Sequence, residues 1–138
     1  MIVLDTDVIS ALMRPQLNAS VYRWLGRQQV ETLRITVVSV HEIVRGIALI
    51  ADGKRKRALE KAFDAIVQSP LGVSVLGVDV AAARSSAICR VSAERAVGHC
   101  DVPDALIAGI ALSNAAALAT RNMPHFKHFG VPVVDPWA

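Results

Sequence analysis

Short apolar runs alternate with helix-like segments along the whole chain, and this alternation limits the possible folds. The first run, MIVLD, is apolar up to its final aspartate, as expected of a strand that is covered on both faces. Strands separated by helices predict a parallel sheet with right-handed crossovers, and therefore an α/β fold. The expected strands are residues 1–5, 33–39, 73–78, 116–120 and 131–136.

The helix-like segments are bounded by residues that commonly start or stop helices. Asp79 is expected to cap a long helix that ends before Gly98, and a second helix over residues 54–68 stops before Pro70. Gly46 lies inside a third helix and is interpreted as a point of close packing. No repeat or linker interrupts the pattern, so we expect a single domain over residues 1–138. The remaining helices are expected over residues 7–14, 18–28, 40–53 and 102–115.

The composition allows a buried core but leaves apolar residues over. Of 138 residues, 53% are hydrophobic and 20% are charged, and the mean hydropathy is +0.41. A chain of this size has a limited interior, so we expect an apolar surface that a partner covers. The longest stretch of low polarity, residues 105–120, is shorter than the ~20 residues of a membrane span.

The ends and the cysteines indicate a cytoplasmic protein. The N-terminus lacks the basic start and the cleavage site of a signal peptide. Cys89 and Cys100 show no metal or redox spacing, and we interpret them as reduced thiols.

The charge is modestly positive and concentrated in one place. The formal net charge is +3, which favours an anionic partner. Four consecutive basic residues stand at the start of an expected helix: Lys54, Arg55, Lys56 and Arg57. This cluster is either a solvated helix start or a contact for the phosphates of an anionic partner. Arg45 is likewise either a phosphate contact or the ion-pair partner of an acid.

Acidic and polar residues follow several expected strands or begin expected helices. In an open α/β sheet, binding sites form beyond the carboxyl ends of the strands, so these side chains can share one pocket. Capping explains several of them equally well, because Ser39 and Glu42 have capping-box spacing and an acid suits a helix N-terminus. Asp5 resists that explanation, since it still belongs to its strand. The full set comprises Asp5, Asp7, Glu42, Asp101, Asp104, Thr120 and Asn122.

Carboxylates that share a pocket repel one another, and their pKa values rise. A divalent cation removes that cost, and Mg²⁺ and Mn²⁺ prefer oxygen ligands. The sequence therefore indicates a cation site if the acids converge.

Four segments carry a resemblance to a known family. In chain order they read MIVLDTDVIS, SVHEIVRGIAL, DVPDALIAGIA and ALATRNMPHF. With this order and spacing they resemble PIN-domain ribonucleases, and the closing VVDPW resembles the VapC-type toxins of type II toxin–antitoxin systems. The resemblance covers essentially the whole chain. It implies a three-layer α/β/α fold and an endoribonuclease, dependent on Mg²⁺ or Mn²⁺, that acts as a toxin.

The resemblance also assigns residues and partners. It implies that Asp5, Glu42 and Asp104 are the catalytic acids that bind the metal. It implies hydrolysis of RNA by an activated water, which leaves a 5′-phosphate and a 3′-hydroxyl. The expected partners are the RNA substrate and a VapB-like antitoxin, in a homodimer or a larger assembly with that antitoxin. Thr6, Asp7, Asp101, Thr120 and Asn122 are expected around the metal-binding acids.

One position departs from the four-acid form of the family pattern. Asn122 stands where a fourth aspartate is often found, and an amide adds no negative charge. This leaves open a non-catalytic module that binds RNA or a partner through a degenerate metal site. A haloacid-dehalogenase-like phosphatase with Asp5 as nucleophile is a further alternative. His125 and His128 are interpreted as residues of a surface loop or a helix end.

Overall fold

The computed structural model of the chain describes residues 1–70 and 75–138. Within them, four short parallel strands form one sheet in the order β2-β1-β3-β4. The strands are β1 (Ile2–Leu4), β2 (Leu33–Arg34), β3 (Ala117–Ala119) and β4 (Val133–Val134). This confirms the expected α/β class with a parallel central sheet.

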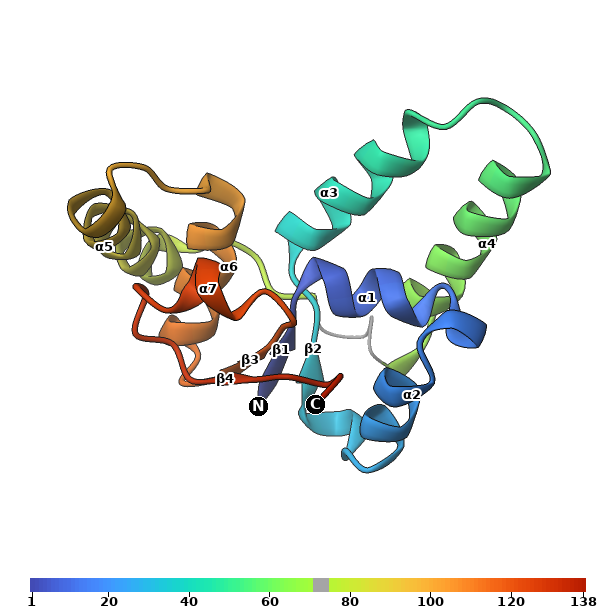
Figure 1. Cartoon of the computed structure of the whole chain (residues 1–138), viewed down its shortest axis with the longest axis horizontal. Coiled ribbons are helices and arrows are strands. Elements are labelled where there is room, and N and C mark those ends of the chain that lie inside the picture. Colours follow the sequence, from blue (N-terminus) through green and yellow to red (C-terminus); the bar gives the residue numbers. More distant parts are fainter. Residues whose placement is uncertain (71–74) are drawn as a thin grey trace.

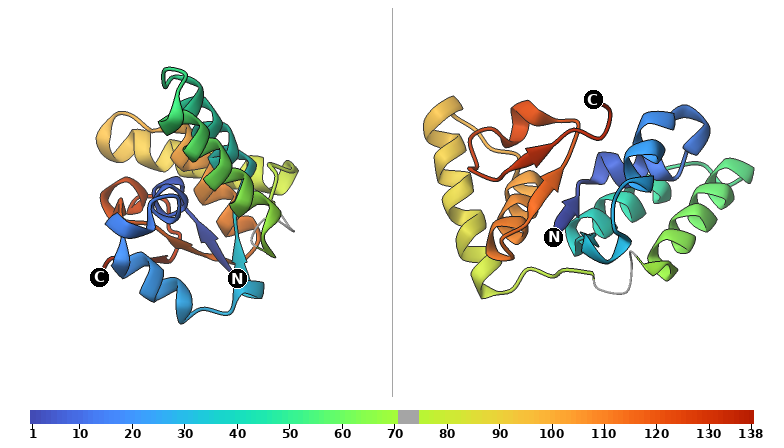
Figure 2. Two further views of the ribbon diagram at one scale, coloured as in Figure 1. Left: turned by 90° about the vertical axis from the view of Figure 1, so that its right-hand side faces the viewer. Right: turned by 90° about the horizontal axis from the view of Figure 1, so that it is seen from below.

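Helices cover both faces of the sheet, which gives the three layers that were expected. The ribbon places α5, α6 and α7 on one side of the sheet and α1 to α4 on the other (Figures 1 and 2). The helices are α1 (Thr6–Leu12), α2 (Ala19–Gly26), α3 (Val37–Ala48), α4 (Lys54–Gln68), α5 (Val80–Val97), α6 (Val102–Ser113) and α7 (Met123–Phe126).

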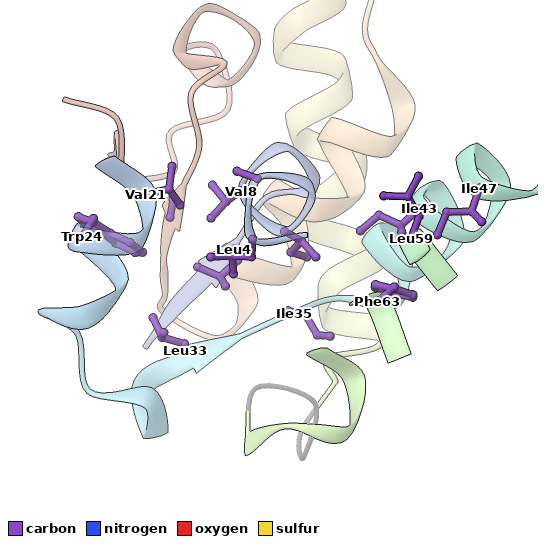
Figure 3. Packing of buried hydrophobic residues seen from close by; sticks show 14 residues of the cluster. Leu4, Val8, Val21, Trp24, Leu33, Ile35, Ile43, Ile47, Leu59 and Phe63 are labelled. Carbon is purple, nitrogen blue, oxygen red and sulfur yellow. The ribbon is translucent and has the colours of Figure 1, made fainter. Parts of the chain in front are cut away.

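The hydrophobic core consists of two clusters, one on each face of strand β1. Successive side chains of a strand point to opposite faces, so Leu4 packs with α1 to α4 while Val3 packs with α5 and α6. Leu4 lies at the centre of the first cluster, with Val8 above it and Leu33 and Ile35 below (Figure 3). Both faces of the strand are therefore buried, which explains why MIVL is continuously apolar. The strand end that follows is held rigidly between two packed layers.

The longest helices begin and end where the sequence predicts. Helix α4 spans residues 54–68, and α5 begins after Asp79, whose Oδ1 accepts a hydrogen bond from the Ala82 N–H at 2.8 Å. Gly98 ends α5 with a φ of 83°, a left-handed conformation that glycine adopts without steric cost.

The prediction of a strand over residues 33–39 is wrong in its second half. The strand ends at Arg34, and α3 begins at Val37 because Thr36 caps the helix. The Thr36 Oγ1 accepts a hydrogen bond from the Ser39 N–H at 3.2 Å, so the expected capping box of Ser39 and Glu42 is also wrong. The real cap lies three residues earlier, and it leaves the side chains of Ser39 and Glu42 free for other contacts.

The other strand predictions are too long. Residues 73 and 74 of the expected strand 73–78 lie outside the described residues. Of its remainder, Leu76 forms only an isolated parallel bridge with Thr36. The strands expected over 116–120 and 131–136 shorten to three and two residues. Short strands leave Thr120 just beyond β3, at the same edge of the sheet as Asp5.

Close helix packing occurs at a different glycine from the one expected. Gly46 has no neighbouring atom within 4 Å of the position where a Cβ would stand, so it is not a packing point. At Gly109 in α6, such a Cβ would lie 2.7 Å from the carbonyl oxygen of Ala82 in α5. Glycine is therefore required where α6 crosses α5.

The two cysteines are free, as expected, and Cys89 is buried against α6. Among the described helices, none has the length and the hydropathy needed to cross a membrane.

Candidate active site

The expectation that Asp5 belongs to its strand and is not a helix cap is wrong, because β1 ends at Leu4 and α1 begins at Thr6. Asp5 follows β1 and caps α1, because its Oδ1 accepts a hydrogen bond from the Thr6 N–H at 2.8 Å. Its Oδ2 accepts a second hydrogen bond from the hydroxyl of Thr120 at 2.8 Å. Only 5% of Asp5 is exposed, and Thr120 is fully buried. Capping therefore uses one oxygen, and the other points across the sheet edge towards β3.

Thr6 joins this acid to α3. Its hydroxyl donates to Oε1 of Glu42 at 2.8 Å and lies 2.9 Å from the hydroxyl of Ser39. Because Thr6 has one hydroxyl proton, Ser39 must be the donor in the second contact. The late start of α3 is what directs Ser39 and Glu42 towards α1.

Two acids at the start of α6, Asp101 and Asp104, have different roles. Asp101 is exposed, and its Oδ1 accepts a hydrogen bond from the N–H of Asp104 at 2.9 Å. The Asp104 carboxylate does not bond back to Asp101. Its Oδ2 lies 2.9 Å from Nδ1 of His125, and its side chain is 14% exposed. Asp101 is therefore the cap of α6, and Asp104 points into the site.

Asp7 lies beside Asp5, and one of its two carboxylate oxygens lacks a hydrogen-bond partner among the described residues. Its Oδ2 accepts a hydrogen bond from the N–H of Arg121 at 3.0 Å. Its Oδ1 is buried and accepts no hydrogen bond from the described residues. A buried acceptor without a partner is costly, and a proton or a cation would relieve that cost.

Burial and mutual repulsion raise the pKa values of these acids. The pKa of Asp5 rises to about 7, first because the group is buried and then because Asp7 is close. The pKa of Asp104 rises to about 6, mainly through burial, with the charges of Asp101 and Glu42 adding to the increase. Burial also raises the pKa of Asp7. The edge of the sheet thus holds carboxylates whose ionised form is destabilised.

The donor atoms fit a hard divalent cation. They are carboxylate and hydroxyl oxygens, which Mg²⁺ and Mn²⁺ prefer. In the described part of the chain, no three His, Cys, Asp or Glu side chains are already gathered closely enough to hold a metal ion. Mg²⁺ commonly uses one or two carboxylates and keeps several waters, so a full cage is not required. The metal-binding role of Asp5, Glu42 and Asp104 stays a prediction.

The basic residues at the start of α4 lie apart from these acids, whereas Arg45 lines a pocket together with Glu42. Helices α3 and α4 form an antiparallel pair that projects from the sheet, and α4 begins at its far tip (Figure 1). Of the four basic residues there, Lys56 pairs with Asp52 at 3.3 Å, while Lys54, Arg55 and Arg57 are exposed. Arg45 is exposed on α3 and forms no ion pair with a described residue. Their contact with RNA phosphates stays a prediction.

Two contacts were missed from the sequence. His125 is exposed near the end of α7, as expected, but the contacts of its ring with Asp104 and Asn122 were not predicted. Arg121 bonds to Asp7 through its backbone, and its guanidinium lies 5.1 Å from the centre of the Trp137 ring. The available signal was the ATRNMPHF segment, which places three polar side chains directly after β3.

A groove opens beside the acids on the α1 side. Its volume is about 670 Å³, and it runs between α1, α3 and Trp137, which is near the C-terminus. Apolar residues of α3 form part of its wall, and its charged lining residues are Asp7, Glu42, Arg14 and Arg121. The groove therefore joins an apolar surface to the carboxylates.

Comparison with known proteins gives consistent results. The PIN-domain family model matches residues 2–130. The VapC ribonuclease Y4jK of Sinorhizobium fredii is 32% identical over 137 residues, covering 99% of this chain and 98% of that protein. Toxin FitB of Neisseria gonorrhoeae is 31% identical over 137 residues, with 99% of both chains covered. The structure of FitAB bound to an IR36 DNA fragment has a TM-score of 0.89, at 31% identity and with 100% and 96% of the chains covered.

Proposed function

The chain belongs to the PIN-domain family, and from this premise we propose that it is an endoribonuclease toxin that uses a divalent cation. Two relatives of the same length support the toxin and nuclease parts of the proposal, since one is named a VapC ribonuclease and the other a toxin. The use of Mg²⁺ or Mn²⁺ is supported by this chain's own acids.

One observation carries the proposal. Asp5 and Asp104 come from segments that are far apart in sequence, and burial together with neighbouring negative charge raises the pKa of both. A fold that needed only helix caps would leave these acids exposed, as it leaves Asp101. Strongly perturbed groups in a pocket are typical of active sites.

Each residue has a distinct task in this proposal. Asp5 and Asp104 would hold the cation with Glu42, which the hydroxyl of Thr6 orients. Thr120 fixes the second oxygen of Asp5. A divalent cation bound there supplies charge that polarises a phosphate and lowers the pKa of water. Exposed bases such as Arg45 and Arg57 would hold the RNA backbone.

Asp5 is poorly arranged for the phosphatase alternative. A nucleophilic carboxylate must present a free oxygen to phosphorus. Both oxygens of Asp5 accept hydrogen bonds, and only 5% of the residue is exposed. These contacts favour a fixed ligand over a nucleophile.

An antitoxin is the proposed protein partner. The groove beside Thr6 and Asp7 has an apolar wall and carries both acids and bases, which suits a peptide with apolar and charged side chains. We place the pair in the cytoplasm, with the toxin in a dimer or a larger assembly with its antitoxin. We expect the chain to arrest growth when it is expressed without a partner. If it does not arrest growth and stays monomeric, this part of the proposal is wrong.

The proposal is tested with purified chain and end-labelled RNA. We expect cleavage with Mn²⁺ or Mg²⁺, no cleavage with EDTA, and products that carry a 5′-phosphate. Recovery after cation is added back serves as the control for unfolding. Equal cleavage in EDTA would reject cation dependence, and binding of RNA without any cleavage would favour the non-catalytic module.

A further inference from the structure

His125 makes a contact that joins two distant parts of the carboxylate site. It lies in α7, and its Nδ1 is 2.9 Å from Oδ2 of Asp104, 21 residues earlier in α6. The same nitrogen is 2.8 Å from the side-chain amide of Asn122, which precedes α7. In the ribbon, α7 lies against α6 (Figure 1). His125 thus lies between Asp104 and Asn122.

The chemistry of the ring decides the direction of these bonds. An ionised carboxylate only accepts, so Nδ1 must carry a proton to bond with Asp104. A nitrogen that carries a proton cannot also accept from the Asn122 amide. Rotating that amide by 180° exchanges its oxygen and nitrogen, which are nearly indistinguishable in shape. The Nδ1–H is then shared between two acceptors, and Asn122 fixes the tautomer of His125.

This arrangement leaves Asp104 with one fixed oxygen and one free oxygen. Oδ2 is held by His125, whereas Oδ1 accepts no hydrogen bond from the described residues. A carboxylate tied at one oxygen keeps a single orientation, so its other oxygen is presented at a fixed place. Groups that hydrogen-bond to metal ligands commonly act in this way.

The negative charge of the site favours a hydrogen-bonding group here that is not itself an acid. A fourth aspartate at position 122 would add to the repulsion that already raises the pKa values of Asp5 and Asp104. A histidine orients Asp104 without adding negative charge. Asn122 then has a role of its own, which is to brace the histidine.

We propose that His125 is a positioning residue that orients the Asp104 carboxylate for cation binding and is itself braced by Asn122. The proposal rests on the cation site of the proposed function. It assigns no direct contact between His125 and the cation or the RNA.

The experiment compares four purified proteins by calorimetric titration with Mn²⁺ at one fixed pH. His125→Ala removes the ring, and His125→Asn keeps a side-chain N–H close to the position of Nδ1. His128→Ala is the matched control, because His128 follows α7 and its only described hydrogen bond uses its backbone carbonyl. The wild-type chain is the reference. His125 is more than half exposed, so its replacement should not unfold the chain.

We expect His125→Ala to weaken Mn²⁺ binding by about 10- to 100-fold. His125→Asn should stay within about 3-fold of wild type, and His128→Ala should equal it. Equal affinity of His125→Ala and wild type would overturn the inference while leaving the cation site intact. No binding by wild type would instead reject the proposed function. Nitrogen hyperfine coupling that appears in the paramagnetic resonance of bound Mn²⁺ and is lost in His125→Ala would also overturn it, because His125 would then be a ligand.

Discussion

Helices α1 and α4 begin with opposite charges, and each start is locally unfavourable for a different reason. The acids at the start of α1 suit the positive end of the helix dipole, but Asp5 is buried and its pKa is raised. The start of α4 is exposed, but four bases face the positive end of its dipole and Gly53 provides no side-chain cap. Among the described residues, the one ion pair that offsets this charge joins Lys56 to Asp52.

At both helix starts the chain keeps charged residues that lower its stability. Natural sequences are mostly consistent from local preference to global fold, and the exceptions are concentrated at functional sites. One exception here is buried and acidic, as a cation site requires. The other is exposed and basic, as a phosphate contact requires. Relieving either conflict should therefore stabilise the chain and reduce its function.

The largest effect is expected at the acidic edge. Asp104→Asn keeps the size of the side chain but removes its charge, and cleavage of RNA should fall by at least ~1000-fold, because cation contributions to catalysis amount to several kcal/mol. Thermal stability without metal should be unchanged or higher, since repulsion from Glu42 is relieved. End-labelled RNA and a thermal melt measure the two quantities.

Asp101→Asn is the matched control for that substitution. Asn caps helices as well as Asp does, and Asp101 contacts only the backbone of its own helix turn. Cleavage should stay near the wild-type rate. If Asp104→Asn also retained full, cation-dependent cleavage, the two acids would be equivalent caps and the contrast between them would be lost.

The next effect is expected at the basic start of α4. Reversing Lys54, Arg55 and Arg57 to Glu should weaken RNA binding by about 10- to 100-fold near 0.1 M salt and should flatten its salt dependence. Stability should increase by about 1 kcal/mol, because acids suit a helix start. Filter binding over a salt series and chemical denaturation measure both changes. Lys56 is kept because of its ion pair.

Reversal of three bases of α5 to Glu, Arg84, Arg90 and Arg95, changes the net charge by the same amount and tests whether position matters. Arg90 pairs with Glu94 at 3.2 Å, so this control is read for RNA binding and not for stability. The three bases are exposed and belong to the opposite side of the sheet. RNA binding should change little there. An equal loss at both places would mean that only the net charge is sensed, and an unchanged salt slope in the α4 variant would leave its basic start as a solvated surface.

A third effect concerns the pH dependence of stability. The pKa values of Asp5 and Asp104 rise from 3.8 to about 7 and about 6, so the folded chain keeps protons that the unfolded chain has released. Stability without metal therefore falls as pH rises from about 4 to about 7. We expect the melting temperature to drop by at least ~5 °C between pH 5 and pH 8.

Mn²⁺ should raise the melting temperature more at pH 8 than at pH 5, because protons compete with the cation. Asp5→Asn should flatten the profile measured without metal. If the melting temperature of the wild type without metal is constant between pH 5 and pH 8, the raised pKa values are contradicted. The acidic start of α1 would then not be destabilising in the way that we describe.

The smallest effect is expected for Asn122→Asp. The new carboxylate adds the fourth negative charge and can still accept from His125, so Mn²⁺ affinity should increase by up to about 10-fold. Stability without metal should fall slightly, since repulsion increases. Calorimetry and melting at pH 8 measure both. A decrease in Mn²⁺ affinity would show that the amide is needed as it is.

Local signals predicted the helices better than the strands. The bounds of α4 and α5 follow from Gly, Pro and Asp punctuation within a few residues of each end, and they were predicted correctly. The strand at 33–39 was extended too far because Val37 and Val38 favour strands, whereas the cap at Thr36 starts a helix there that packs against α1. Tertiary context overrode a weak β preference there.

The sequence predicted the acids of the site but not the side chains that hydrogen-bond to them. Asp5 stands out because it directly follows a buried strand, which is a local signal. The pairing of Asp104 with His125 spans 21 residues and depends on how α7 lies against α6, so no spacing in the sequence reveals it. The bond from Thr6 to Glu42 was hidden in the same way, because it depends on where α3 begins.

Calorimetric titration with Mn²⁺ of the wild type, Asp101→Asn and Asp104→Asn tests most directly whether the acidic edge is a cation site. We predict saturable binding by the wild type, the same binding by Asp101→Asn, and binding weakened at least ~100-fold in Asp104→Asn. A circular dichroism spectrum of each protein establishes that it is folded. Equal Mn²⁺ binding by folded Asp104→Asn and wild type, or none by the wild type, would contradict the account.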